Sequence, residues 1–116
     1  MDTTIPERIT RFIAEYIPSI GILEILVVFY EEPEKEWTAL AVTQAVRMEL
    51  SSVEARMDYL ISAELLTART MAGVRLYRYG PSTAELADTI DELIRWYSSH
   101  RVAIISLVYS NPSDRR

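Results

Sequence analysis

Five arginines stand in the middle of the chain, in the one part of the sequence that is not acidic. Residues 37–80 hold five basic and four acidic residues, whereas residues 1–36 hold three basic and eight acidic ones. The five side chains are those of Arg47, Arg56, Arg69, Arg75 and Arg78. A guanidinium group binds phosphate oxygens through paired hydrogen bonds, and Ser51 and Ser52 add hydroxyl donors for the same ligand. These residue types make phosphate binding the first chemistry to consider.

Two carboxylates close to these groups oppose that chemistry. Glu54 and Asp58 fall in the segment 52–63, in which Arg56 is the only basic residue. The chain of 116 residues has a formal charge of −5, which by itself disfavours a general nucleic-acid binder. The arginines therefore either meet a phosphate-bearing partner or pair with nearby acids, and the sequence leaves both outcomes open.

Other chemistries find less support in the residue types. His100 is the only histidine, and its neighbours Ser98 and Ser99 would point in other directions on a helix, so no Ser-His-Asp set is indicated. The helix-spaced carboxylates of residues 88–92 are expected to form a solvated face. The absence of cysteine excludes a disulfide framework and a thiolate metal site. We therefore expect no enzyme, no metal and no cofactor.

Two N-terminal helices are expected to precede the arginine-bearing region. Residues 6–17 place apolar side chains on one face, and Pro18 ends the segment. Residues 20–31 are apolar almost all round, which indicates a helix buried on several sides. Their β-branched run is also compatible with a strand, but the length and the capping residue Ser19 favour a helix.

The next segments alternate helix signals with a turn. Thr38 is expected to cap a short helix that buries Leu40, Val42 and Val46. Ser51 followed three residues later by Glu54 has the form of a capping box, which predicts a helix over 52–63. Its core-facing residues follow helical spacing: they are Val53, Met57, Leu60 and Ile61.

A hairpin and a long helix complete the expected order. The strand-like runs within 66–79 are joined by "MAG", in which Gly73 has the backbone freedom that a tight turn requires. Ser82 with Glu85 forms a second capping box and predicts a helix over 83–109. The residues "SSH" at 98–100 either kink this helix or split it in two.

The stretch from Trp37 to Tyr79 resembles the DNA-binding core of bacterial regulators of the MarR, ArsR and PadR type. The run "VEARMDYLISAELL" is similar to the family's helix-to-wing pattern, with Glu64 where those proteins usually have glycine. The stretches "SIGILEILVVFYEEPEKEW" and "WYSSHRVAIISLVYSNP" resemble small, poorly characterised bacterial winged-helix proteins. The resemblance implies a mainly α-helical winged helix-turn-helix fold with a small β-hairpin wing, an extra N-terminal helix and a long C-terminal helix. It further implies one domain over 1–116, with a core at 19–81 and a dimerisation helix at 82–109.

The function that the resemblance implies is that of a DNA-binding transcriptional regulator that acts by occupying an operator. Helix 52–63 would enter the major groove of double-stranded DNA, and the wing at 66–79 would contact the backbone. Arg56 and the start of helix 52–63 would read bases, and Ser51 and Ser52 at that start would donate to phosphate. Arg47 is a basic contact before the helix, and Gln44 and Tyr59 would add polar contacts. Arg69, Arg75 and Arg78 would hold the backbone. The alternative is a winged-helix module that binds proteins and not DNA.

A homodimer is expected from the apolar C-terminal run. "RVAIISLVY" is apolar on several sides, and its exposure is unfavourable unless a partner helix or the N-terminal helices cover it. In related regulators, terminal helices pair across a twofold axis. The expected seam residues are Trp96, Tyr97, Ile104, Ile105 and Val108. The start "MDTTIPER" does not have the form of a signal peptide, and no apolar stretch is long enough to span a membrane, so we expect a cytoplasmic protein.

Overall fold

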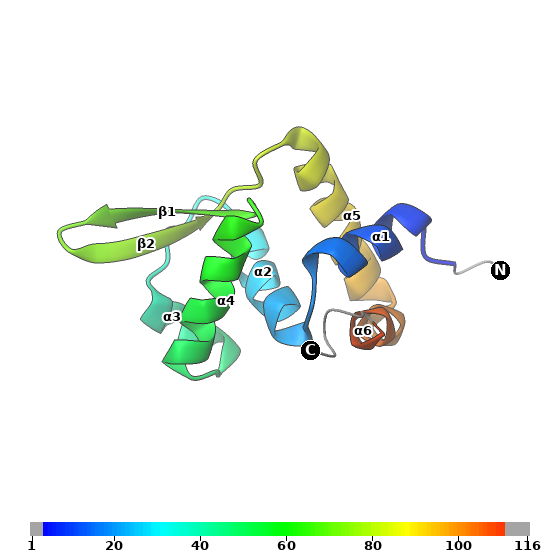
Figure 1. Ribbon diagram of the computed structural model, residues 1–116, viewed down its shortest axis with the longest axis horizontal. Helices are drawn as coiled ribbons and strands as arrows, with labels where there is room; N and C mark the ends of the chain where they lie inside the picture. The colour runs from blue at the N-terminus through cyan, green and yellow to red at the C-terminus, as the bar shows by residue number, and fades with distance from the viewer. Residues whose placement is uncertain (1–3, 111–116) are drawn as a thin grey trace. The chain divides into compact units, whose positions relative to one another are not determined.

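The computed structural model describes residues 4–110, which form six helices and one hairpin (Figure 1). In chain order the elements are α1 (Glu7–Tyr16), α2 (Ile20–Glu31), α3 (Ala39–Val46), α4 (Leu50–Ser62), β1 (Leu66–Met71), β2 (Val74–Tyr79), α5 (Ala84–Ser99) and α6 (Arg101–Tyr109). The predicted fold class, mainly helical with a small hairpin, is confirmed. No single described helix has both the length and the apolar composition of a membrane span; α1 and α2 reach them only if they are counted together across the break between them.

The chain divides into two compact units. The hairpin unit is Gly21–Ser82, and the terminal unit combines Met1–Ile20 with Thr83–Arg116. In the terminal unit, α1 packs against α5 and α6, and Ile9, Phe12 and Ile13 of α1 are buried. In the hairpin unit, α3 packs on α4 and both helices contact the hairpin.

Helix α2 is apolar on nearly all sides, and its burial follows from that composition. Its buried residues are Ile22, Leu23, Ile25, Leu26 and Phe29. A strand of this sequence would expose half of these side chains, whereas the helix buries them together. The expectation of a helix over 20–31 is confirmed.

The helix starts agree only in part with the expected caps. Thr38 accepts a hydrogen bond from the Ala41 amide at 3.1 Å, as expected. Helix α4 begins at Leu50, so its cap position is Glu49, and the expected capping role of Ser51 is wrong. Helix α5 is capped by Thr83 and not by Ser82, whose hydroxyl donates to Glu64 Oε1 at 2.7 Å. Adjacent hydroxyl residues make the cap position ambiguous in the sequence.

The helix expected over 83–109 is split at its histidine. His100 has φ −134° and ψ 58°, which lie outside the helical region, and α5 ends before it while α6 starts after it. Its backbone amide still donates to the Trp96 carbonyl at 2.6 Å. The "SSH" segment therefore breaks the helix.

The hairpin has a two-residue turn that fixes its register. Met71 pairs with Val74, and the turn residues Ala72 and Gly73 both have positive φ, at 53° and 80°. Two positive φ values define the type I′ turn that suits the twist of a hairpin. Because side chains alternate along a strand, Arg69 and Arg78 share one face with Thr67 and Leu76, whereas Arg75 shares the other with the buried Tyr77.

Candidate nucleic-acid interface

The exposed face of α4 is polar and acidic. Ser51, Glu54, Ala55, Asp58 and Ser62 are exposed along it, at helical spacing. Val53, Met57 and Leu60 are buried on the opposite face, as the sequence predicted. Ser52 and Tyr59 are half-buried between the two faces. The exposed face of α4 thus carries two carboxylates and no basic side chain. The one arginine of the helix, Arg56, is half-buried on another side.

Arg56 is turned toward α2 and away from that exposed face. A Cβ placed on Gly21 would lie 2.6 Å from Arg56 Nε, so the guanidinium covers the glycine backbone. One terminal nitrogen donates to the Ser52 carbonyl at 3.3 Å, and Nε is buried without a hydrogen-bond partner among the described residues. Arg56 therefore does not point from the exposed face of α4, as a base-reading residue was expected to do. Because Gly21 has no side chain, the arginine fills the space beside it.

The hairpin arginines, Arg69, Arg75 and Arg78, each lie beside a carboxylate. Arg69 donates through Nε and a terminal nitrogen to the two carboxylate oxygens of Glu36, at 2.5 and 2.7 Å. Arg78 donates to Glu34 at 2.8 Å and approaches the Pro33 carbonyl at 3.5 Å. The structure therefore brings these arginines together with acids and not into an open basic patch.

The third hairpin arginine pairs with α4. The closest Arg75 nitrogen lies 3.9 Å from an Asp58 oxygen, a loose ion pair between two exposed side chains. Arg75 also lies over the Tyr77 ring, 5.4 Å from its centroid. Burial raises the pKa of the Tyr77 phenol above its ordinary value; the charge of Arg75 lowers it, and Asp58 and Glu54 raise it. Asp58 on the exposed face of α4 is thus partly balanced by the hairpin.

The pairing of Arg69 with Glu36 shifts both groups toward their charged forms. The hydrogen bonds from Arg69 are the largest influence and lower the pKa of the Glu36 carboxyl below its ordinary value. The charges of Arg69 and Arg78 add to the lowering, and desolvation opposes it. The same hydrogen bonds raise the pKa of Arg69. Both groups are charged at neutral pH.

Arg47, in the turn between α3 and α4, differs from the hairpin arginines in its surroundings. Arg47 ends α3 in the left-handed conformation, with φ 59° and ψ 46°, and its side chain is exposed. Among the described residues, no carboxylate lies within ion-pair distance of it. Gln44 is exposed one turn earlier on α3. Of the expected phosphate-binding arginines, Arg47 is the one that the fold leaves available.

The start of α4 follows Arg47 within a few residues. The cap residue Glu49 makes no side-chain hydrogen bond to the helix. The first-turn amides of a helix have no partner within that helix, and together with the helix dipole they favour anions. Ser51 is exposed there and Ser52 is half-buried. Arg47, these amides and the Ser51 hydroxyl are donors of the kind that bind phosphate, and the exposed Glu49 carboxylate stands among them.

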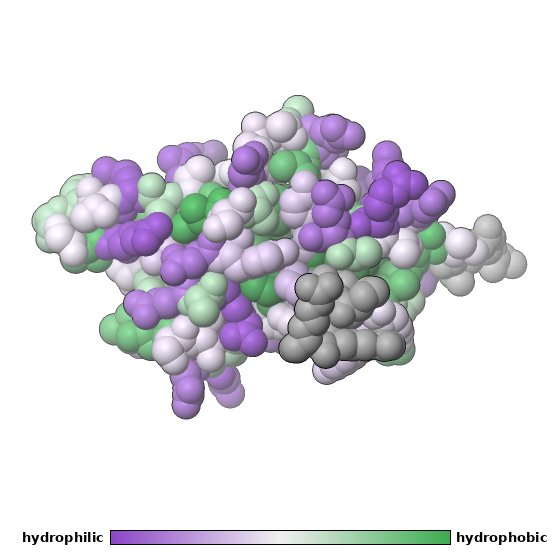
Figure 2. Space-filling model, in the orientation of Figure 1, coloured by the Kyte–Doolittle hydropathy of each residue, from purple (hydrophilic) through white to green (hydrophobic). Residues whose placement is uncertain are grey.

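The sequence did not reveal two features of the hairpin unit. In the acidic segment 31–36, Glu34 and Glu36 pair with arginines of the hairpin. The sequence shows only that the two carboxylates stand one and three residues before Trp37; in the structure Glu34 lies in a turn and Trp37 forms an isolated bridge with Tyr77. The hairpin turn is flanked by Met71 and Val74, exposed at 48% and 49%, and Figure 2 shows green, hydrophobic atoms at this free end on the left.

The expected dimer seam is only partly exposed in the terminal unit. Tyr97, Ile104 and Val108 are buried, at 6%, 0% and 0% exposure, so their side chains are already covered within this chain. Ile105 is half-buried. The opposite face of α6 exposes Val102 at 78% and Tyr109 at 64%. The apolar periodicity of this helix serves the core on one face and leaves a second apolar face uncovered.

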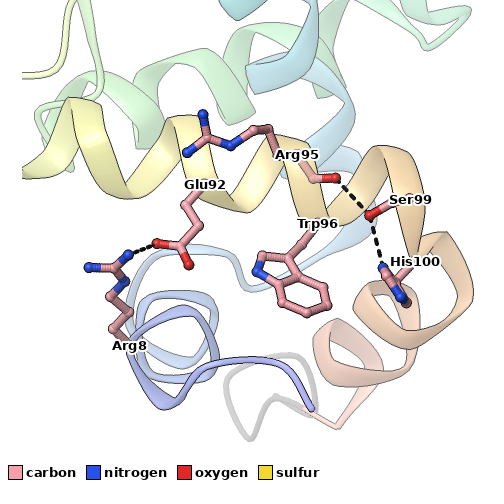
Figure 3. Close-up of a pocket in the computed structure, with 6 residues that line it drawn as sticks. All are labelled: Arg8, Glu92, Arg95, Trp96, Ser99 and His100. Atoms are coloured by element: carbon pink, nitrogen blue, oxygen red, sulfur yellow. Dashed lines mark hydrogen bonds and ion pairs between the residues drawn. The ribbon is translucent and has the colours of Figure 1, made fainter. Parts of the chain in front are cut away.

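Trp96 lines a shallow pocket of about 320 Å³ in the terminal unit (Figure 3). Its ring lies against the His100 ring, with 4.8 Å between centroids. The Ser99 hydroxyl donates to the Arg95 carbonyl at 3.1 Å and lies 2.8 Å from His100 Nδ1, while Arg8 pairs with Glu92 across the pocket. Serine and histidine are adjacent at a helix break, with no carboxylate on the histidine among the drawn residues. Among the described residues, no group of three or more His, Cys, Asp or Glu side chains is arranged to hold a metal ion.

Comparison with known proteins gives structural and not sequence similarity. No protein-family model matches the chain, and no curated protein matches it significantly. HlyU from Vibrio cholerae superposes with a TM-score of 0.61 at 16% identity, over 82% of this chain and 99% of that chain. A possible transcriptional regulator from Methanosarcina mazei gives 0.56 at 15% identity, over 91% and 93%.

A third similar structure carries a fold description. It is the homodimeric winged helix-turn-helix DNA-binding domain of a possible ArsR-family transcriptional regulator from Mycobacterium bovis, with a TM-score of 0.57 at 20% identity, over 86% of this chain and 95% of that chain. Similarity at these identities reports on the fold and not on the ligand. The order of helices, the turn between α3 and α4 and the hairpin after α4 agree with it, and the chain therefore has the winged helix-turn-helix fold.

Proposed function

We propose that this protein is a DNA-binding transcriptional regulator that acts by occupying an operator. The observation that carries the proposal is the turn between α3 and α4. There Arg47, which has no ion-pair partner among the described residues, precedes the start of α4, whose cap residue makes no side-chain hydrogen bond. In winged helix-turn-helix proteins this end of the recognition helix faces the major groove. The similar structures include transcriptional regulators and a DNA-binding domain, which supports the proposal. The proposal assigns no catalytic step and places the protein in the cytoplasm.

The residues expected from the sequence to contact DNA are not all equally accessible in the proposed complex. Arg47, Gln44 and Ser51 are exposed and form the primary contacts, with Ser52 and Tyr59 at their edge. Arg69, Arg75 and Arg78 reach the DNA backbone only after they leave their carboxylate partners. Arg56 contributes by holding α4 on α2, because its guanidinium covers Gly21.

We propose further that residues 1–116 act as one functional domain that assembles as a homodimer. The uncovered face of α6 has apolar or small side chains at positions 102, 105, 106 and 109, which share one side of a helix. An exposed apolar face of this kind is the usual mark of a partner surface. The homodimeric neighbour supports this arrangement. A twofold dimer would present two copies of α4 to two half-sites.

Fluorescence anisotropy with a random-sequence duplex, titrated with salt, tests the DNA proposal. Wild-type protein is expected to bind at low salt, with an affinity that falls steeply as salt increases because counterions are released. Arg47→Gln is compared with Arg11→Gln, which makes the same charge change on an exposed arginine of α1. Arg47→Gln should weaken binding and Arg11→Gln should not. Absence of wild-type binding at the lowest salt would contradict the proposal and favour a module that binds proteins.

A further inference from the structure

Two carboxylates of the segment 31–36 pair with two of the hairpin arginines, Glu36 with Arg69 and Glu34 with Arg78. We propose that Glu34 and Glu36 act as an internal substitute for DNA phosphate, so that the hairpin contacts a duplex only when DNA displaces them. This inference rests on the proposed function and concerns the regulation of the same surface. It assigns to two glutamates a role in discriminating an operator from random DNA.

Arg69 presents a fork of two donors to both oxygens of Glu36, at 2.5 and 2.7 Å. A guanidinium uses the same two-donor fork for a phosphate group. The donors that would hold a phosphate on this face are therefore already engaged, and Arg78 is engaged in turn by Glu34 at 2.8 Å.

The main chain next to these carboxylates is hydrogen-bonded to the hairpin. Trp37 forms a bridge with Tyr77: its amide donates to the Tyr77 carbonyl at 2.7 Å, and the Tyr77 amide donates back at 2.8 Å. The segment thus ends at a residue that is joined to the open edge of β2 by one isolated bridge, and the sheet itself has two strands. The segment is fixed to the hairpin by main-chain hydrogen bonds and not by the ion pairs alone.

Both carboxylates meet the same face of the hairpin. Glu34 and Glu36 lie two residues apart and reach Arg78 and Arg69, which share one face of the hairpin. The intervening Lys35 lies over the Trp37 ring, 3.9 Å from its centroid, and pairs with Glu32 at 3.4 Å. The one cation of the segment is thus directed away from the two acids, which leaves both carboxylates for the hairpin arginines.

The consequence concerns affinity for random DNA. Nonspecific binding depends on the number of phosphates that unpaired cations neutralise. With Arg69 and Arg78 paired, a duplex that approaches the hairpin must first separate two ion pairs and then leave two carboxylates close to its own negative charge. Only a site that also gains contacts with α3 and α4 offsets this cost.

The test neutralises the two carboxylates without changing their shape. Glu34→Gln/Glu36→Gln is compared with Glu15→Gln/Glu31→Gln, which removes two exposed carboxylates that form no ion pair among the described residues. Both variants change the net charge equally. On a random duplex, the first should bind at least about tenfold more tightly than wild type, with a salt slope steeper by about two phosphates. The second should stay within about threefold of wild type.

A readout without DNA separates failure of this inference from failure of the proposed function. The Nε–H resonances of Arg69 and Arg78 are followed by NMR while inorganic pyrophosphate is added. They should shift in Glu34→Gln/Glu36→Gln at concentrations that leave wild type and the control variant unchanged. If all three proteins respond equally to pyrophosphate, or both variants gain equally in DNA affinity, the inference is overturned. If pyrophosphate discriminates them but none binds DNA, the inference holds for phosphate and the DNA proposal fails.

Discussion

The hairpin unit and the terminal unit differ in how the fold makes candidate binding residues unavailable to a partner. In the hairpin unit the groups in question are charged, and Arg69, Arg75 and Arg78 are offset by carboxylates within ion-pair distance. In the terminal unit the groups are apolar, and Tyr97, Ile104 and Val108 are covered by burial. In both units a neighbouring set remains available: Arg47 in the first, and Val102 with Tyr109 in the second. Residue type therefore identifies candidates, and only the packing decides which of them can meet a partner.

The largest expected effect separates the two faces of α6. Val108→Asp should lower the free energy of unfolding by about 4 kcal/mol, because it places a charge at a fully buried position without a partner. Val102→Asp, on the face exposed at 78%, should change stability by less than about 0.5 kcal/mol and shift the proposed dimer to monomer. Chemical denaturation and sedimentation velocity measure the two quantities. A stable dimer of Val102→Asp would place the dimer contact elsewhere.

The next effect compares the two kinds of arginine in the hairpin unit. Arg47→Gln should weaken binding to random DNA about five- to tenfold at 0.1 M salt, the loss expected for one phosphate contact. Arg69→Gln/Glu36→Gln removes a neutral pair and should leave the affinity within about twofold. Anisotropy at several salt concentrations provides both values. Equal losses in the two proteins would mean that the pairing does not reduce the contribution of Arg69.

A smaller effect tests the junction between α4 and the hairpin. Glu64 has φ 67°, a left-handed conformation that costs a non-glycine residue about 1 kcal/mol. Glu64→Gly should therefore raise the free energy of unfolding by about 0.5–1 kcal/mol, although it removes the hydrogen bond from Ser82. Glu64→Ala keeps the strain and loses the same hydrogen bond, so it should fall below wild type in thermal unfolding. The reverse order would show that the Ser82 contact outweighs the strain.

The smallest effect is a dependence on pH. The lowered pKa of Glu36 means that its contribution to stability is present above the pKa of the unfolded chain and is lost as pH falls through the folded value. The stability difference between wild type and Glu36→Gln should shrink between neutral and acidic pH. Urea denaturation at a series of pH values provides the measurement. A difference that stays constant into acid would show that the pairing with Arg69 adds no pH-dependent stability.

Local patterns predicted the elements because each one depends on nearby residues. The apolar spacing of α4, the all-round apolar α2 and the Gly73 turn can each be read within a few residues of chain. The similarity of "VEARMDYLISAELL" to a helix-to-wing pattern even placed Glu64 at the glycine position, and the structure gives it a left-handed backbone.

The sequence could not show which side chains are available to a partner, because this depends on residues far away along the chain. Arg69 meets Glu36 across 33 positions and Arg78 meets Glu34 across 44. The spacing of Arg56 is compatible with the exposed edge of α4. The side chain instead lies beside Gly21 of α2, where the glycine leaves room for it. For α6, an apolar pattern on several sides does not say which side its own unit covers.

The discontinuous terminal unit has a consequence for the order in which the chain acquires structure during synthesis. The hairpin unit is one continuous stretch, Gly21–Ser82, so all its residues have been made before α5 exists. Helix α1 belongs to the terminal unit. Its apolar residues Ile9, Phe12 and Ile13 therefore stay unburied until α5 and α6 have been synthesised. Because domains fold as they are completed and distant contacts form slowly, we expect the nascent chain to present a finished winged core and an unsatisfied N-terminal helix. That interval is when the chain is most exposed to chaperones and to aggregation.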